Sequence, residues 1–198
     1  VYVAVGKGDS SMDALSWALK RVARPSSFVY LIHVFPEVHH IPTPLGMLPK
    51  NQVTPQQVET YMSQERSKRT KLLQKYLSLC LNSKVQVDTF LVESDLVPKA
   101  ILELIPVLHI RRLIMGTSKS SIRMLKKGSG KIAPVLKDAP AYCEVKIICE
   151  GQEVRTTIDE VAPSISPLNQ EEEKGGKDMD KDQNTDMASC NCFSRKCI

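Results

Sequence analysis

Aromatic residues are scarce in this sequence of 198 residues, where Phe, Tyr and Trp together make up 5%. Surfaces that stack bases on aromatic rings need more of them, so no nucleic-acid partner is expected. No apolar run approaches the roughly 18 residues of a membrane-spanning helix. A secretory signal, basic and then apolar, is also missing from the start. These absences favour a cytosolic or nuclear protein over a secreted one, and we predict the cytoplasm. The six cysteines are therefore expected to be mostly reduced thiols.

The net charge of +5 hides two regions of opposite sign. Residues 1–150 carry a net charge of +9, whereas residues 151–198 carry −4. Part of the positive charge follows one face of a predicted helix, at Arg66, Lys68, Arg69, Lys71 and Lys75. Because no aromatic platform accompanies this basic face, we interpret it as a solvated helix surface.

Apolar, strand-like runs alternate with helical patterns through the first 150 residues. Strands are predicted at residues 1–5, 28–35, 85–92, 112–115 and 142–149, and helices at residues 12–22, 55–81, 97–109 and 128–137. The proline-rich segment that begins at Pro36 is predicted to be a loop. Strands that alternate with helices indicate an α/β fold with an open, doubly wound parallel sheet. Such sheets bind ligands outside the carboxyl ends of their strands.

The periodic pattern fades after Glu150. We predict an α/β domain at residues 1–152 and a disordered tail at residues 153–198, which is acidic and then contains cysteines. Val1 already lies in a strand-like run, so we expect the chain to be a fragment or to lack a few starting residues. Near the other end, Cys190, Cys192 and Cys197 lie beside apolar and basic residues, a pattern that suits S-acylation and peripheral membrane attachment. The alternative is that these cysteines are incidental.

The most informative stretch joins a predicted strand to two separate glycines. Gly116 follows the strand at residues 112–115, and Gly128 and Ser129 open the next predicted helix. Glycine allows the backbone to approach a phosphate, and the free amides of a helix N-terminus stabilise its charge. Lys119 and the basic residues after it add positive charge. The spacing alone leaves a phosphate site and a solvated basic loop as equal alternatives.

Four segments carry a resemblance to a known family. They run from Val1 to Lys7, from Ile41 to Gly46, from His109 to Gly116, and from Ile148 to Gly151. Together with the order of the elements, they resemble the universal stress protein domain, and more narrowly the version at the N-terminus of plant U-box kinases. The resemblance covers about residues 1–152. It implies a Rossmann-like sheet of five parallel strands in the order 3-2-1-4-5, ATP or another adenine nucleotide as ligand, and a homodimer through the last strand.

The resemblance also implies where a nucleotide would lie. The predicted binding residues are Val5, Gly6, Val34, Gly116, Lys119, Gly128 and Ser129, with the base near Val5 and Val34 and the phosphates at Gly116, Gly128 and Ser129. ATP-binding members of the family carry the motif Gly-x2-Gly-x9-Gly-Ser/Thr, from which this sequence departs twice. Lys119 stands at the second glycine, and eight residues instead of nine separate it from Gly128. Gly6 also replaces an acidic residue that follows the first strand in the family.

We predict a non-catalytic, nucleotide-responsive domain that acts in signalling through protein partners. No carboxylate–histidine–nucleophile arrangement stands out, and the glycine-rich loop and catalytic loop of a kinase are missing from these residues. The domain would then be a stand-alone module or a detached part of a U-box kinase. Two alternatives stay open, namely an interaction module that has lost ATP binding and a slow nucleotide hydrolase.

The histidines and terminal cysteines are weak evidence for a metal site. His33 belongs to a strand pattern, while His39 and His40 lie in the proline-rich loop without a carboxylate at ligand spacing. Cys190 and Cys192 lack a second ligand pair of the kind that structural zinc sites use. We therefore predict no metal ligand among these residues.

Overall fold

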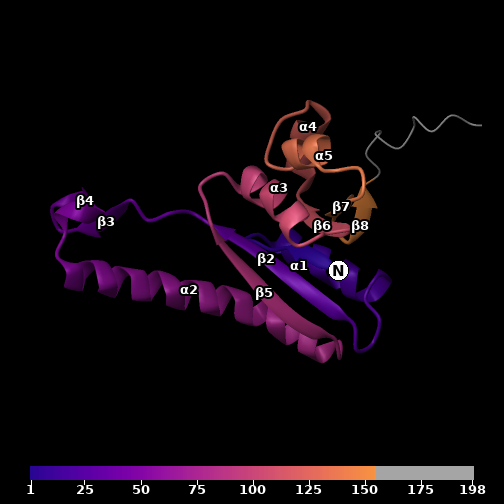
Figure 1. Ribbon diagram of the computed structural model, residues 1–198, viewed down its shortest axis with the longest axis horizontal. Helices are drawn as coiled ribbons and strands as arrows, with labels where there is room; N and C mark the ends of the chain where they lie inside the picture. The colour runs from indigo at the N-terminus through magenta and orange to yellow at the C-terminus, as the bar shows by residue number, and fades with distance from the viewer. Residues whose placement is uncertain (155–198) are drawn as a thin grey trace, which may run out of the picture. The chain divides into compact units, whose positions relative to one another are not determined.

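The computed structural model describes residues 1–154, which form an α/β domain around a sheet of six strands. The strand order is β5-β2-β1-β6-β7-β8 (Figure 1). The five parallel strands are β1 (Tyr2–Ala4), β2 (Phe28–Phe35), β5 (Gln86–Glu93), β6 (Arg112–Thr117) and β7 (Glu144–Cys149). Their spatial order is the predicted 3-2-1-4-5. The prediction of only five strands is wrong, because β8 (Gln152–Val154) pairs antiparallel with β7.

Helices cover both faces of the sheet, as the alternation of strands and helices predicted. They are α1 (Asp9–Arg21), α2 (Pro55–Asn82), α3 (Val97–Val107), α4 (Lys119–Lys126) and α5 (Ala133–Asp138). One core lies under α1 and α2, where Leu15 and Tyr76 pack on strand residues such as Val3. The other core includes Ile101 of α3 and Val135 of α5. Neighbouring strand residues enter opposite cores because side chains alternate across a strand.

The proline-rich segment forms an arm outside the main sheet. It contains a two-stranded hairpin of β3 (His40–Thr43) and β4 (Gly46–Pro49), followed by the short 3-10 helix η1 (Lys50–Gln52). The hairpin lies beside the N-terminal end of α2, away from the sheet (Figure 1). Thr54 caps α2 in a capping box with Gln57, and Pro55 occupies the first turn. The prediction of a loop is wrong at the hairpin, although this proline-rich segment contributes no strand to the main sheet.

Two predicted boundaries around the glycines are wrong. β6 does not stop at Gly116 but continues to Thr117. The helix predicted to open at Gly128 begins only at Ala133, and the unpredicted helix α4 occupies much of the loop before it. Ser118 provides the signal for α4, since its hydroxyl accepts a hydrogen bond from the backbone amide of Ser121. A helix therefore lies where the sequence predicts a loop.

The described part of the chain also bears on membranes and cysteine chemistry. None of its helices combines the length and the apolar character that crossing a bilayer requires. Cys80, Cys143 and Cys149 are buried free thiols, as expected. The terminal cysteines Cys190, Cys192 and Cys197, and all of the predicted tail beyond residue 154, lie outside the described residues.

Candidate functional site

A cavity of about 660 Å³ opens at the carboxyl ends of β1, β2 and β6. This is where the strand order reverses direction around β1, and doubly wound sheets bind their ligands at such a point. The apolar part of its lining consists mainly of Val5, Ile32, Val34, Val97, Ile101, Met115 and Ile132. The polar part is Lys7, Ser10, His33, Thr117, Ser118, Ser121, Ser129 and Lys131. Apolar walls with a few polar groups are typical of a pocket for a small organic ligand.

The turn after β1 is held by hydrogen bonds on both sides. The backbone amide of Gly6 donates to the Ser11 hydroxyl at 3.0 Å, and the Tyr76 hydroxyl donates to the Gly6 carbonyl at 2.6 Å. Burial raises the pKa of the Tyr76 phenol, so its hydroxyl remains a donor in the neutral pH range. The contact ties α2 to one rim of the cavity.

His33 presents a ring nitrogen at the same rim. The side chain is buried, and its Nδ1 lies 2.9 Å from the Val5 carbonyl oxygen. Because a carbonyl oxygen can only accept, Nδ1 must carry the hydrogen in this contact. In the neutral ring Nε2 is then a hydrogen-bond acceptor. The prediction of a core histidine agrees with this burial, while its place on the cavity lining was not anticipated.

Thr117 lines the cavity and carries a buried polar group without a partner. Its residue is only 3% exposed, and its Oγ1 is buried without a hydrogen-bond partner. Leaving a buried hydroxyl unpaired costs about 1–3 kcal/mol, so such a group in a cavity lining points to a ligand that pairs with it. Thr117 is not among the binding residues predicted from the sequence. Its position at the carboxyl end of β6 was the signal that could have found it.

Serines gather at the N-terminus of α4, on the same side of the cavity as Thr117. The Ser118 hydroxyl lies 2.9 Å from the Ser120 hydroxyl and 3.0 Å from that of Ser121. Ser118 and Ser121 line the cavity. Hydroxyls and the first backbone amides of a helix are the donors that phosphate oxygens accept from. This side of the cavity is therefore suited to an anion.

This chain is similar both to curated proteins and to solved structures. U-box domain-containing protein 33 of Arabidopsis thaliana is 30% identical over 180 residues, which cover 84% of this chain and 21% of that protein. U-box domain-containing protein 36 of the same organism is 30% identical over 155 residues, covering 76% and 33%. The chain thus spans about a fifth to a third of the length of these relatives. No protein-family model matches the sequence.

Among solved structures, a universal stress protein family protein from Arabidopsis thaliana with AMP bound has a TM-score of 0.50 to this chain at 19% identity. The alignment covers 75% of this chain and 91% of the other. The chain has the universal stress protein fold. The resemblance noted in the sequence, both to this fold and to plant U-box proteins, is confirmed.

Within this universal stress protein fold, five of the seven predicted site residues line the cavity. They are Val5, Gly6, Val34, Gly116 and Ser129. Lys119 and Gly128 are not among the lining residues. The strand-end residues come together because parallel strands present their carboxyl ends at one edge of the sheet, whereas the other two depend on the path of the chain after β6.

Lys119 is directed to an acidic partner instead of the cavity. Its Nζ lies 2.8 Å from Oε2 of Glu150, which follows β7. The hydrogen bond to Glu150 and its negative charge raise the pKa of Lys119, so the lysine stays protonated. Both side chains are exposed, and an exposed pair of this kind adds little to stability.

Gly128 and Ser129 follow the end of α4, whereas the sequence predicts that they open a helix. The Gly128 amide donates to the Leu125 carbonyl, and the Ser129 amide donates to the Met124 carbonyl at 2.9 Å. With Gly128 at φ +69°, these bonds form a Schellman motif at the C-terminus of α4. The predicted phosphate cradle at a helix N-terminus is therefore not formed by Gly128. The Ser129 hydroxyl lines the cavity but donates to the Met124 carbonyl.

Gly116 is required by packing. A Cβ atom at this position would lie 2.0 Å from the backbone oxygen of Ser10, because β6 passes very close to the start of α1. The same close approach puts Ser10 on the cavity lining. Gly116 thus shapes the cavity by letting α1 approach β6, in addition to lining it.

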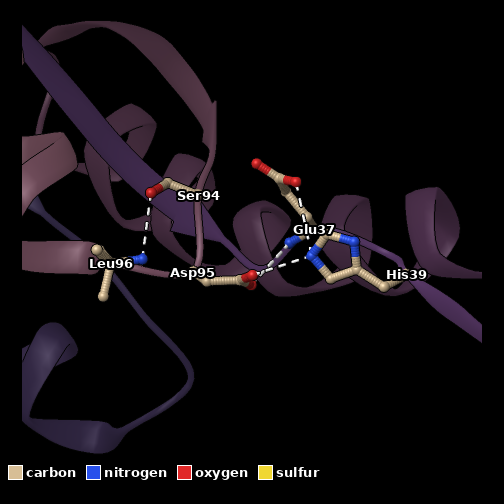
Figure 2. A network of polar contacts seen from close by, with 5 residues as sticks. All are labelled: Glu37, His39, Ser94, Asp95 and Leu96. Carbon is tan, nitrogen blue, oxygen red and sulfur yellow. Dashed lines mark hydrogen bonds and ion pairs between the residues drawn. The ribbon is translucent and has the colours of Figure 1, made fainter.

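The described residues do not support a metal site at the histidines. His39 contacts two carboxylates, with Nε2 at 3.1 Å from Asp95 and 3.6 Å from Glu37 (Figure 2). The expectation of a histidine without a nearby carboxylate is wrong, since Asp95 reaches His39 from the turn after β5. Even so, residues 1–154 contain no group of three or more His, Cys, Asp or Glu side chains that could hold a metal ion.

Proposed function

We propose that this domain binds an adenine nucleotide in the cavity at the carboxyl ends of β1, β2 and β6. The observation that carries the proposal is the lining of this cavity, which includes Thr117, a residue whose buried hydroxyl has no hydrogen-bond partner among the described residues. The apolar walls around Val5 and Val34 suit a purine, and the serines at the start of α4 suit a phosphate. The AMP bound to the Arabidopsis protein of the same fold supports an adenine ligand.

The proposed role is binding and signalling without turnover, in the cytoplasm and through protein partners. Among the described residues that line the cavity there is no carboxylate that could serve as a general base beside a nucleotide phosphate. The similarity to U-box proteins supports a module that in related chains is part of a longer protein. A homodimer remains part of the proposal, and it would use β8, because β8 covers the outer edge of β7.

The test compares the full chain with the variant Thr117→Val in titrations with AMP, ADP and ATP by calorimetry. Valine keeps the shape of threonine and removes the unpaired hydroxyl, so the variant should unfold at the same or a higher temperature. Its affinity for AMP should fall by about tenfold, the value of one good hydrogen bond to an anion. No binding heat and no melting shift with any of the three nucleotides would reject the nucleotide site.

An interaction module that lacks nucleotide binding is the second candidate. This candidate is favoured because two of the predicted binding residues make other contacts. Lys119 pairs with Glu150, and Gly128 belongs to the cap of α4. A full chain that binds no nucleotide but retains a cooperative unfolding transition would support this candidate. Hydrolysis of a nucleotide is the least favoured function. Release of phosphate from ATP that is abolished by Thr117→Val would support it.

A further inference from the structure

A second hollow, a groove of about 680 Å³, lies between α2 and the arm that follows β2. Apolar side chains line part of it, namely Phe35, Pro36, Val38, Met47, Tyr61 and Leu72. The hairpin residue Met47 is 61% exposed there, although methionine usually packs in a core. An exposed apolar surface of this kind, surrounded by polar groups, indicates a binding surface.

The remaining lining is rich in positive charge. Lys7, Lys68, Arg69, Lys71 and Lys75 line the groove, against only two carboxylates, Glu37 and Glu65. Both carboxylates already have a positive or polar neighbour. Glu65 pairs with Lys68 at 2.7 Å, and Glu37 lies 3.6 Å from Nε2 of His39.

The other four cations have no acidic partner among residues 1–154. Elsewhere on α2, Arg66 pairs with Glu59, and Lys68 has Glu65 as its partner. By contrast, Arg69, Lys71 and Lys75 of α2 and Lys7 after β1 make no ion pair with the described residues. The guanidinium of Arg69 instead lies 3.6 Å above the Phe35 ring, which holds it at the groove wall. Four uncompensated positive charges beside an apolar surface are complementary to a chain that is both acidic and apolar.

The arm that forms the far wall is fixed in place. The backbone amide of Glu37 donates to Asp95 at 3.2 Å, and the ring of His39 contacts the other oxygen of the same carboxylate (Figure 2). Ser94 in turn accepts from the amide of Leu96, which orders the turn that carries Asp95. The groove is therefore braced at the base of the arm, so a ligand need not order that wall.

We propose that this groove binds an extended acidic peptide of a partner protein, whose carboxylates pair with Arg69, Lys71 and Lys75 and whose apolar side chains contact Phe35, Met47 and Leu72. A peptide fits better than a nucleic acid because the Phe35 ring is already covered by the guanidinium of Arg69 and the ring of His39 is held by Asp95, which leaves less aromatic surface for stacking bases. It also fits better than a free phosphate, which would leave the apolar part of the groove in water. The proposal does not require that the neighbouring cavity holds a nucleotide.

The test measures fluorescence polarisation of a labelled peptide of twelve residues with alternating Glu and Leu, added to the full chain. The double variant Lys71→Glu with Lys75→Glu should bind it at least about tenfold more weakly, because two attractive charge pairs become repulsive. The control is Lys20→Glu with Lys137→Glu. It makes the same change of net charge at two exposed lysines outside the groove, and its affinity should equal that of the native chain.

Three further ligands distinguish an acidic, apolar peptide from other possible occupants of the groove. The same peptide with Gln for Glu should lose binding through lost charge, and oligoglutamate without Leu should bind more weakly because it leaves the apolar wall uncovered. Tripolyphosphate should compete only at far higher concentration than the peptide. Equal weakening by the groove variant and the control would overturn the proposal as non-specific charge attraction. So would tripolyphosphate that competes as strongly as the peptide, since the groove would then be a small-anion site.

Discussion

The cavity and the groove share four lining residues, Lys7, His33, Phe35 and Pro36, yet they are built in different ways. The cavity lies at strand ends, where backbone hydrogen bonds and the close approach of α1 set its shape. The groove lies against the exposed side of one long helix, where side-chain charge and the arm define it. The shape of the cavity thus depends on main-chain geometry, and that of the groove on surface residues. Substitutions should therefore affect the two hollows very differently.

Replacing Gly116 with alanine should have the largest effect on the free energy of unfolding, because it disturbs the main-chain packing of β6 against α1. The added methyl group would lie 2.0 Å from the Ser10 backbone oxygen, so α1 and β6 must separate. We expect a loss of about 3 kcal/mol or more in the free energy of unfolding, measured by urea titration with circular dichroism.

Gly6→Ala is the matched control at the same rim. A Cβ atom there would meet only the Ser11 hydroxyl oxygen at 3.8 Å, which is ordinary van der Waals contact. Its free energy of unfolding should change by less than about 1 kcal/mol. Similar losses for both variants would show that the cavity does not depend on the close packing of Gly116.

Gly128→Ala should have an intermediate effect, on stability and not on nucleotide affinity. At φ +69° alanine is strained, and the substitution should cost about 1–2 kcal/mol. Gly128→Asn should cost less, since asparagine tolerates this conformation in helix caps. AMP titration of both variants decides the role of the glycine. A tenfold loss of AMP affinity with native stability would instead assign Gly128 to the phosphates, as the sequence motif suggested.

Tyr76→Phe should have the smallest effect, and it addresses the link between the two hollows. The hydroxyl joins α2, which forms the groove, to the Gly6 turn at the cavity. Its removal should cost about 1 kcal/mol in the free energy of unfolding. Tyr61→Phe on the same helix is the control, because the Tyr61 hydroxyl makes no hydrogen bond with any described residue. Equal unfolding free energies for the two variants would mean that this link contributes no stability.

The fold could be predicted from the sequence largely because its signals are local. Continuous apolar runs such as residues 28–35 identify buried strands, and Thr54 with Pro55 marks the start of α2. The strand order of the five parallel strands followed only from the family resemblance. The sixth strand was missed because three residues, Gln152–Val154, carry too short a pattern to be distinguished from a tail.

The candidate site was predictable in part, for a reason that its residues make clear. Val5, Gly6 and Val34 reach the cavity simply because they end parallel strands that lie next to each other. Lys119 and Gly128 could not be placed in this way. Their positions depend on α4, a helix of eight residues that is too short to show a clear periodic pattern in the sequence. Thr117 was overlooked because a threonine carries no motif of its own.

By itself, the sequence determined the α/β class, the positions of the main strands and helices, and the set of strand ends at which a ligand would bind. Hydrophobic periodicity and capping act over a few residues, so one chain is enough to reveal them. Only the tertiary structure decided that Gly116 lets α1 approach β6, that Glu150 engages Lys119, and that the cations of α2 face an apolar arm. Those contacts join residues from 31 to 106 positions apart, and no local pattern encodes which of them meet.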